Sequence, residues 1–298
     1  EFVLEKLEFE KILNQISKYS YTESGKNLIL NLFPASDLAF IKTEGILIEE
    51  AKEILNKAGH PPIEFISDIN RSLIESRIEG AIISSNKVLE VLKLAKTSRL
   101  LIQFLKSELK DDSKLRDKLN FLFSDKLFEH HIEKVINEQG EVRENASNEL
   151  SRIRKDINSR RNELVKSINR IIKTLKDDDI VREDYLTLRD GRMVIPIKAE
   201  HKRHIRGFIH SESSTGQTVY IEPEETLDLN NDIISLSFAE RREIERILKE
   251  LTKMIGQSSE QLKTSLDTIA YIDSIFARAK YSTEIIGSFP QVDNTKPI

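Results

Sequence analysis

Positively charged and imidazole side chains gather in the short stretch His201–Arg206, which reads His-Lys-Arg-His-Ile-Arg. Ammonium and guanidinium groups bind phosphate oxygens through charge and hydrogen bonds, and an imidazole adds a further donor or acceptor. The surrounding residues 182–210 contain seven lysines and arginines against four acids, a net charge of +3. We therefore predict that this region binds the backbone of a nucleic acid without reading its sequence. The predicted contact residues are Arg189, Arg192, Lys198, His201, Lys202, Arg203, His204 and Arg206.

The sequence gives weaker signals for a metal site, a catalytic site or a nucleotide-binding loop. His201 and His204 could begin a metal site, but the chain has no cysteine and no second histidine pair nearby, so we predict no metal ion. Glu222, Glu224 and Glu225 lack an accompanying base or nucleophile. We expect these carboxylates in a solvated turn or at a helix N-terminus. No glycine-rich phosphate loop is present, and we predict no catalytic residue and no bound cofactor in this chain.

The stretch Ser213–Gly216, which reads Ser-Ser-Thr-Gly, has two interpretations. Its hydroxyl and backbone N–H groups could hold a phosphate. It could equally be an ordinary hairpin turn, since serine and glycine are typical turn residues. The residues alone favour neither interpretation.

Charge also separates along two flanking stretches. Residues 147–176 carry nine lysines and arginines against three acids, whereas residues 212–250 carry four against ten. The basic stretch could face a phosphate backbone. Alternatively, the two stretches are helices that pair with each other through flanking salt bridges. Pairing explains the helices better, but it leaves the basic cluster at His201–Arg206 unexplained, and there we favour contact with nucleic acid.

The spacing of apolar residues predicts the elements that position these side chains. From Leu150 to Leu175 the apolar residues are separated by 3, 4, 7, 4, 3 and 4 positions, which is typical of a coiled-coil seam and predicts one helix over about 147–176. A second heptad helix is predicted over about 228–257. Between them, Asp190-Gly191 separates two apolar runs and predicts a β-hairpin, and further strands follow within about 180–224. Pro196 favours an edge or bulged position in that sheet.

The rest of the chain shows the 3.6-residue period of helices joined by short loops. The predicted fold is mainly α: a multi-helix assembly with an inserted antiparallel two-helix coiled-coil arm, which carries a small antiparallel β-sheet at its tip. The predicted divisions are 1–135 for the first helical part, 136–257 for the insertion and 258–298 for the returning helical part. In the last part, a helix over about 259–282 brings the chain back.

Composition narrows the class of protein further. The 298 residues have a net charge of −4, so a nucleic-acid surface must be local. The absence of cysteine fits a reducing cytoplasm, where we expect this protein. No stretch of about 18 apolar residues or signal peptide is evident. Because the chain begins without methionine and ends abruptly, we expect it to be part of a longer protein.

Three stretches resemble the clamp region of the second bacterial branch of the MutS family (MutS-two): Arg189–Glu200, Gly207–Pro223 and Leu229–Asn231. Leu7–Leu13 is similar to the first helix of that branch, and Phe276–Tyr281 to the end of its lever. The resemblance covers nearly the whole chain. It implies that residues 1–135 and 258–298 form a helical lever and that residues 136–257 form a clamp inserted into it.

The same resemblance implies a function. Proteins of this branch carry an ATPase domain after the lever and usually a small MutS-related nuclease domain, so ATP, magnesium and catalysis are expected outside these residues. The branch is linked to branched-DNA binding, suppression of recombination and splitting of collided ribosomes. We therefore expect a non-catalytic, DNA-binding lever and clamp, in a parent that forms a homodimer. The alternatives are a clamp that binds the ribosome or its RNA, and a structural spacer or dimerisation module whose parent binds through other domains.

Overall fold

The computed structural model describes residues 2–176, 180–181 and 187–290. Helices make up 64% of the chain, and the strands form one small four-stranded antiparallel sheet, which confirms the predicted mainly α class. The chain divides into two compact units, which we call the helical unit (residues 1–143 and 248–298) and the β-bearing unit (residues 144–247). Within the described ranges, no helix is both long and apolar enough to cross a bilayer.

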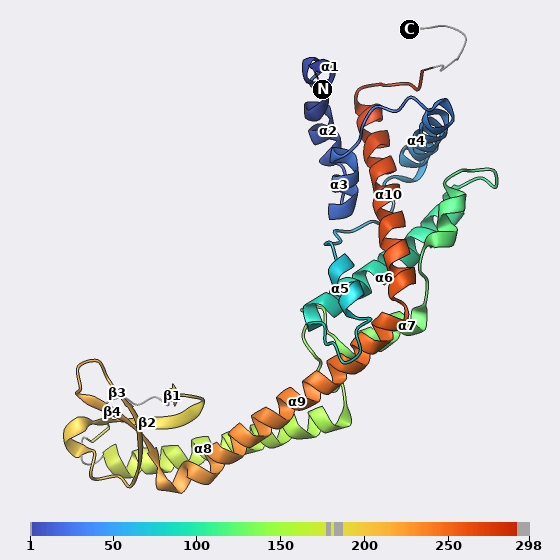
Figure 1. Cartoon of the computed structure of the whole chain (residues 1–298). Coiled ribbons are helices and arrows are strands. Elements are labelled where there is room, and N and C mark those ends of the chain that lie inside the picture. The colour runs from blue at the N-terminus through green and yellow to red at the C-terminus, as the bar shows by residue number, and fades with distance from the viewer. Residues whose placement is uncertain (1, 177–179, 182–186, 291–298) are drawn as a thin grey trace. The chain divides into compact units, whose positions relative to one another are not determined.

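The helical unit packs around α10 (Ser259–Glu284), drawn in red in Figure 1. This helix contacts α2, α3, α4, α5 and α6, because its aliphatic residues and Phe276 recur around most of its circumference and are buried. Its bounds agree with the helix predicted over 259–282. The other elements of this unit are α1 (Phe2–Lys6), α2 (Phe9–Ser17), α3 (Glu23–Leu30), α4 (Leu38–Ala58), α5 (Asn70–Glu75), α6 (Ser85–Glu108), η1 (Arg116–Phe121) and α7 (Lys126–Val135).

A buried carboxylate fixes the start of one of these helices. Asp273 of α10 is fully buried and accepts hydrogen bonds from the Ser20 hydroxyl at 2.6 Å and from the Thr22 backbone N–H and hydroxyl, both at 2.8 Å. The Thr22 hydroxyl in turn accepts the Gly25 N–H and so caps α3. α10 therefore holds the N-terminus of α3 by polar contacts as well as by packing.

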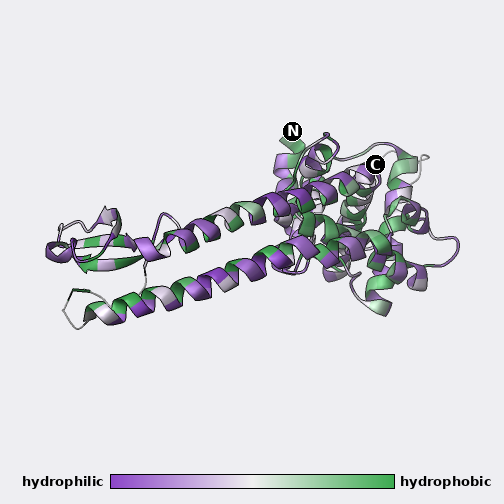
Figure 2. Ribbon diagram, turned by 90° about the horizontal axis from the view of Figure 1, so that it is seen from below, coloured by the Kyte–Doolittle hydropathy of each residue, from purple (hydrophilic) through white to green (hydrophobic). Residues whose placement is uncertain are grey.

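Two long helices frame the β-bearing unit: α8 (Asn148–Lys176) and the first part of α9 (Leu227–Gln257), which continues past Ile247 into the helical unit. Figure 1 shows the two helices side by side, and Figure 2 shows many polar residues along both of them. Their bounds match the predicted helices within a residue. The end predicted for the first helix, at 177–179, lies outside the described residues.

Ion pairs join α8 to α9, as the pairing interpretation predicts for the helices. Arg154 contacts Glu240 at 2.7 Å, and Arg160 contacts Asp232 at 3.4 Å. Along α8, burial follows the predicted spacing from Leu150 to Ile168.

Nearer the sheet, burial along α8 departs from the predicted spacing. Ile172 is buried in place of the predicted Ile171. Ile172 joins a hydrophobic core that includes residues of α8, the sheet and α9. Packing against the sheet, as well as against α9, therefore determines which face of α8 is buried there.

At the start of α8, Ser147 caps the helix by accepting the Leu150 N–H, and it donates its hydroxyl proton to Glu243 of α9 at 2.7 Å. Arg246 also binds this carboxylate, with two bonds of 2.8 Å. The Arg246 guanidinium, with help from Ser147, lowers the pKa of Glu243 to about 2 against the opposing effect of burial.

The sheet has the order β1-β2-β4-β3, with β1 (Thr187–Arg189), β2 (Arg192–Lys198), β3 (Gly207–Glu212) and β4 (Thr218–Pro223). The predicted hairpin is present: Asp190 and Gly191 both have positive φ, 50° and 77°, which is why an Asp-Gly pair suits this turn. The start predicted for the first strand, at 185–186, lies outside the described residues.

Two features of the sheet differ from expectation. Pro196 lies in β2, which has neighbours on both sides, rather than on an edge. The described β1–β2 ladder ends at Val194, two residues before Pro196. The lack of a backbone N–H in proline therefore removes no hydrogen bond from this ladder. The bulge lies instead in β3, between Ile209 and Ser211.

At the start of β3, a Cβ on Gly207 would approach the Glu222 carbonyl oxygen to 2.1 Å, so only glycine fits there.

Candidate nucleic-acid interface

The loop from η2 (Ala199–His201) to β3 carries a group of exposed basic side chains. Its backbone is held at both ends: Ala199 donates to the Gln217 carbonyl oxygen at 3.0 Å, and Glu224 donates to the Arg206 carbonyl oxygen at 3.0 Å. Lys202, Arg203 and Arg206 are exposed and form no ion pair with any residue that the structure describes. The loop therefore presents three charges without a described counter-ion, on a backbone that is hydrogen-bonded at both ends.

The two histidines of this loop lie against each other. Their ring centroids are 5.2 Å apart, and the Nδ1 atom of His204 is 3.2 Å from the His201 carbonyl oxygen. His204 is exposed, whereas His201 is half-buried beside Glu200. In the described part of the chain, no group of three or more His, Cys, Asp or Glu side chains could hold a metal ion.

Arg192, another predicted contact residue, is engaged within the protein. Its guanidinium donates to the Glu222 carboxylate at 2.7 Å and to the Asn231 side-chain oxygen at 2.6 Å. His210 donates through Nε2 to the other oxygen of Glu222, also at 2.6 Å. Only 1% of the Glu222 side chain is exposed, so its negative charge depends on these two partners.

The expectation of a solvated Glu222 is therefore wrong, although Glu224 and Glu225 are exposed as predicted. The expectation failed because the partners of Glu222 lie 30 and 12 residues earlier in the chain, where no local pattern links them. Sequence reasoning also missed Asn230. Its side-chain amide accepts the Met193 N–H at 3.0 Å and donates to the Met193 carbonyl oxygen at 3.2 Å, which ties β2 to α9.

The remaining predicted residues lie apart from the loop or within the sheet. Arg189 has its guanidinium carbon 4.0 Å from the centroid of the Tyr220 ring, a cation–π contact. Lys198 is half-buried at the end of β2 opposite to Arg192. Because a seven-residue strand spans about 20 Å, the eight predicted residues do not form one cluster. The structure brings together His201–Arg206 and leaves Arg189 and Arg192 at the β1–β2 turn.

The Ser213–Gly216 stretch is a hairpin turn. The Ser213 backbone N–H donates to the Thr218 carbonyl oxygen at 2.8 Å, and the Ser213 hydroxyl accepts the Thr218 N–H at 3.1 Å. These bonds use groups that a phosphate would need, which favours the ordinary-turn interpretation.

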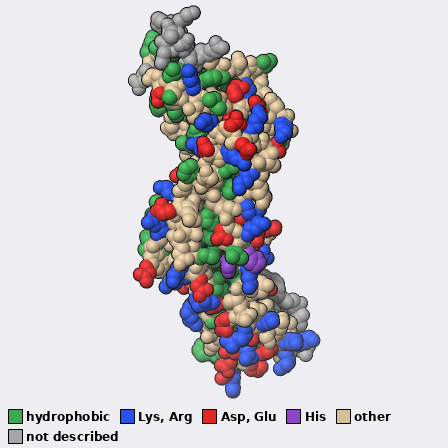
Figure 3. All heavy atoms as spheres, turned by 90° about the vertical axis from the view of Figure 1, so that its right-hand side faces the viewer, with side chains coloured by type: hydrophobic (Ala, Val, Ile, Leu, Met, Phe, Trp, Pro, Cys, Tyr) green, Lys and Arg blue, Asp and Glu red, His purple; other side chains and the backbone are tan. Residues whose placement is uncertain are grey.

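Charge on the rest of the surface is mixed. On the face shown in Figure 3, acidic and basic side chains are interspersed over both parts of the chain. Of the basic residues of α8, Arg154 and Arg160 pair with α9, while Lys166, Arg170 and Lys173 are exposed without an ion pair to any described residue. Within the β-bearing unit, the basic side chains available to a partner therefore include the end of α8 near the sheet and the loop that carries Lys202, Arg203 and Arg206.

Several known proteins are similar to this chain over nearly its whole length. A protein named endonuclease MutS2 from Halothermothrix orenii is 32% identical in an alignment 302 positions long, which covers 99% of this chain and 38% of that protein. Proteins of the same name from Clostridium perfringens and a Geobacillus species are each 32% identical over 98% of this chain and cover 37% and 38% of their own lengths. The chain thus spans less than two fifths of these relatives. No family model matches the chain.

Proposed function

Because this chain belongs to the MutS2 family over nearly its whole length, we propose that its β-bearing unit is a clamp that grips the backbone of duplex or branched DNA without sequence specificity. The observation that carries this proposal is the trio of exposed side chains Lys202, Arg203 and Arg206, which share one loop and form no ion pair with any residue that the structure describes. Cations held in this way release counterions when they meet phosphates, which gives affinity but little sequence information.

Basic residues that already form ion pairs within the protein are less available to bind phosphate. Arg154 and Arg160 already compensate acids of α9, so a phosphate would have to displace Glu240 or Asp232 to reach them. Arg192 compensates a buried carboxylate and cannot leave it without a large cost. We therefore assign the backbone contacts chiefly to Lys202, Arg203 and Arg206, with His204 as an additional donor.

The helical unit would serve as the lever that carries this clamp. We propose that this region is not catalytic and that ATP hydrolysis with magnesium, nuclease activity and the main homodimer contact belong to other parts of the full-length protein. The relatives are named endonucleases, which supports the nuclease part of this proposal. We propose the role in suppressing recombination on the basis of the family resemblance, and the cytoplasmic location on the basis of the absence of cysteine.

Two alternatives use the same geometry. The clamp could bind ribosomal RNA on a collided ribosome, since RNA offers the same phosphates. The ion pairs between α8 and α9 also suit a structural spacer or dimerisation module, with binding elsewhere in the parent. Reversing the charges of Lys202, Arg203 and Arg206 separates the three proposals: it should weaken DNA binding, weaken ribosome binding, or leave binding by the full-length protein unchanged.

A fluorescence-anisotropy titration tests the proposal. The 298-residue chain is titrated with duplex and four-way-junction DNA at low and at physiological salt. The test variant is Lys202→Glu/Arg203→Glu/Arg206→Glu. Its matched control, Lys42→Glu/Lys114→Glu/Lys263→Glu, changes the net charge equally at exposed lysines of the helical unit that form no ion pair with the residues described.

We expect salt-sensitive binding that the loop variant loses and the control retains. Each phosphate contact removed should lower the slope of log affinity against log salt by about one. Equal loss in both variants would show that net charge, and not this loop, governs binding. If the chain binds ribosomes but not DNA, and the loop variant abolishes that binding, the RNA alternative is correct. Unchanged binding of full-length protein carrying the loop variant would favour the spacer.

A further inference from the structure

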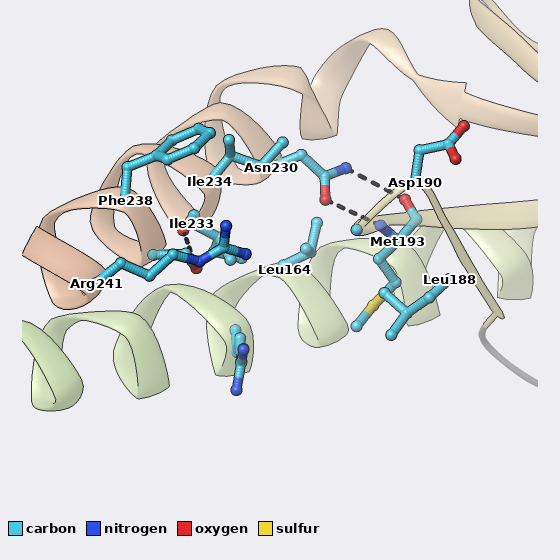
Figure 4. Close-up of a pocket in the computed structure, with 12 residues that line it drawn as sticks. Leu164, Leu188, Asp190, Met193, Asn230, Ile233, Ile234, Phe238 and Arg241 are labelled. Carbon is cyan, nitrogen blue, oxygen red and sulfur yellow. Dashed lines mark hydrogen bonds between the residues drawn. The ribbon is translucent and has the colours of Figure 1, made fainter. Parts of the chain in front are cut away.

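A groove of about 590 Å³ opens in the β-bearing unit between α8, the β1–β2 turn and α9 (Figure 4). Its floor is formed by Leu164 and Ile233, which are buried, and Met193 adds an apolar wall. Phe238 of α9 stands beside these residues with 53% of its surface exposed. The volume is within the usual range of small-molecule sites, and the exposed aromatic ring is available to a ligand.

The heptad pattern of α8 has a gap where this groove opens. The apolar spacing skips from Ile157 to Leu164, and the intervening seam position falls at Arg160 and Arg161. Arg160 pairs with Asp232, whereas Arg161 lines the groove. Because no apolar side chain fills the seam at this level, space remains between the helices and the hairpin.

One face of α9 supplies the opposite side of the groove. Asn230, Ile234, Phe238 and Arg241 recur at intervals of four, four and three residues, which places them in a row along the helix. The Arg241 guanidinium carbon lies 5.7 Å from the centroid of the Phe238 ring. Figure 4 shows both side chains at the end of the groove away from Leu188 and Asp190.

Positive charge predominates at the groove, whose charged lining consists of two arginines and one acid, Asp190, which lies at the end away from Arg241 (Figure 4). Arg161 and Arg241, one from each helix, form no ion pair with any residue that the structure describes. The floor, by contrast, offers only aliphatic side chains. A ligand that satisfies both must carry a flat or apolar part for Phe238 and the floor, and an adjacent negative charge for the two guanidinium groups.

We propose that this groove binds an unpaired nucleobase of a nucleic acid strand, which stacks on Phe238 while its flanking phosphates contact Arg161 and Arg241. Stacking on an aromatic ring beside cationic groups is a general mode of binding single-stranded nucleic acid. This inference rests on the proposed function and adds to it a second contact, distinct from the loop that carries Lys202, Arg203 and Arg206.

The groove should not distinguish strongly among the four bases. The side-chain amide of Asn230, a polar group that could read a base edge, is occupied on both atoms by the Met193 backbone, as the dashed lines in Figure 4 show. Recognition would then come from stacking, which every base offers. The expected ligand is an extruded or unpaired nucleotide of any sequence, as occurs at a bulge or a junction.

A comparison of two DNA duplexes tests this inference. Both contain a one-nucleotide bulge, which is thymine in one duplex and an abasic analogue in the other, so that the phosphate charge is identical. We expect the 298-residue chain to bind the thymine bulge about tenfold more tightly. Phe238→Ala should abolish this preference, and because the side chain is half-exposed, its melting temperature should stay near that of the parent chain. The same pair of bulges in RNA shows whether the strand must be DNA.

Phe208→Ala is the matched control, since Phe208 is a 62% exposed aromatic residue of β3 that does not line the groove. It should leave the preference for the base unchanged. A photoreactive 5-iodouracil placed at the bulge should cross-link to the peptide containing Phe238. Cross-linking to residues 202–208 instead would overturn the inference.

The outcomes separate this inference from the proposed function. Equal affinity for thymine and abasic bulges, with salt-sensitive binding that still depends on Lys202, Arg203 and Arg206, would overturn the groove assignment and leave the clamp proposal standing. Absence of binding to any DNA or RNA would overturn both. Self-association of the chain that Phe238→Ala abolishes, without any preference for the base, would assign the groove to a second copy of the chain and also overturn the inference.

Discussion

Arg192 and Glu222 lie on neighbouring strands of the sheet, with a guanidinium nitrogen 2.7 Å from a buried carboxylate oxygen. His210 binds the second carboxylate oxygen, so three strands of the sheet contribute to one network. Because removing one partner of a buried ion pair leaves a charge without compensation, this network links the basic β1–β2 turn to the stability of the sheet.

Arg192→Ala should therefore destabilise the β-bearing unit by about 3 kcal/mol. Arg206→Ala, at an exposed arginine without an ion pair to the described residues, should change stability by less than about 0.5 kcal/mol. Urea denaturation followed by circular dichroism measures both. Arg192→Lys keeps the charge but not the two-pronged geometry and should fall between them. Equal stability of the Arg192→Ala and Arg206→Ala variants would contradict a structural role for this pair.

The low pKa of Glu243 predicts a dependence of stability on acid. Its folded-state pKa of about 2 lies below the ordinary value of 4.5, so ionisation stabilises the fold above pH 4.5, and this contribution is lost as the pH falls toward 2. We expect Glu243→Gln to remove about 1 kcal/mol at pH 7 and to flatten the loss of stability between pH 4.5 and 2. Thermal melts across this range test the prediction, and a variant whose pH profile parallels that of the parent chain would refute it.

The ion pair between Arg154 and Glu240 should be measurable by a double-mutant cycle. Reversing either charge alone places like charges together across α8 and α9, whereas Arg154→Glu/Glu240→Arg restores the attraction. We expect a coupling free energy of about 1 kcal/mol, near the upper end for surface pairs, because both side chains are only about one-quarter exposed. Additive effects of the two single variants would show that the pair does not contribute to helix pairing.

The contacts of Asp273 predict a large effect in the helical unit. Asp273→Ala leaves the Ser20 hydroxyl and the Tyr21 and Thr22 N–H groups without their buried acceptor, and it weakens the cap of α3. We expect a loss of about 3 kcal/mol. Asp267→Ala, at an exposed position of the same helix, is the control and should cost less than about 0.5 kcal/mol. Chemical denaturation of the two variants compares them directly.

The sequence by itself determined the elements whose signals are local. Heptad spacing located α8 and α9 within a residue of their ends, and Asp190-Gly191 located the hairpin, because side-chain periodicity and the backbone preferences of a turn act between near neighbours. The basic cluster at His201–Arg206 was also visible, since its charges lie next to one another in the chain.

Only the tertiary structure decided which of the charged residues are available to a partner. Arg192 and Arg206 are the same residue type in one basic stretch, yet one is committed to Glu222 and the other is exposed. Likewise, the seam gap at Arg161 became a groove because Phe238, 77 positions later, lies on a face of α9 turned toward it. Contacts between distant segments depend on how strands and helices pack, so the local spacing of residues does not predict them.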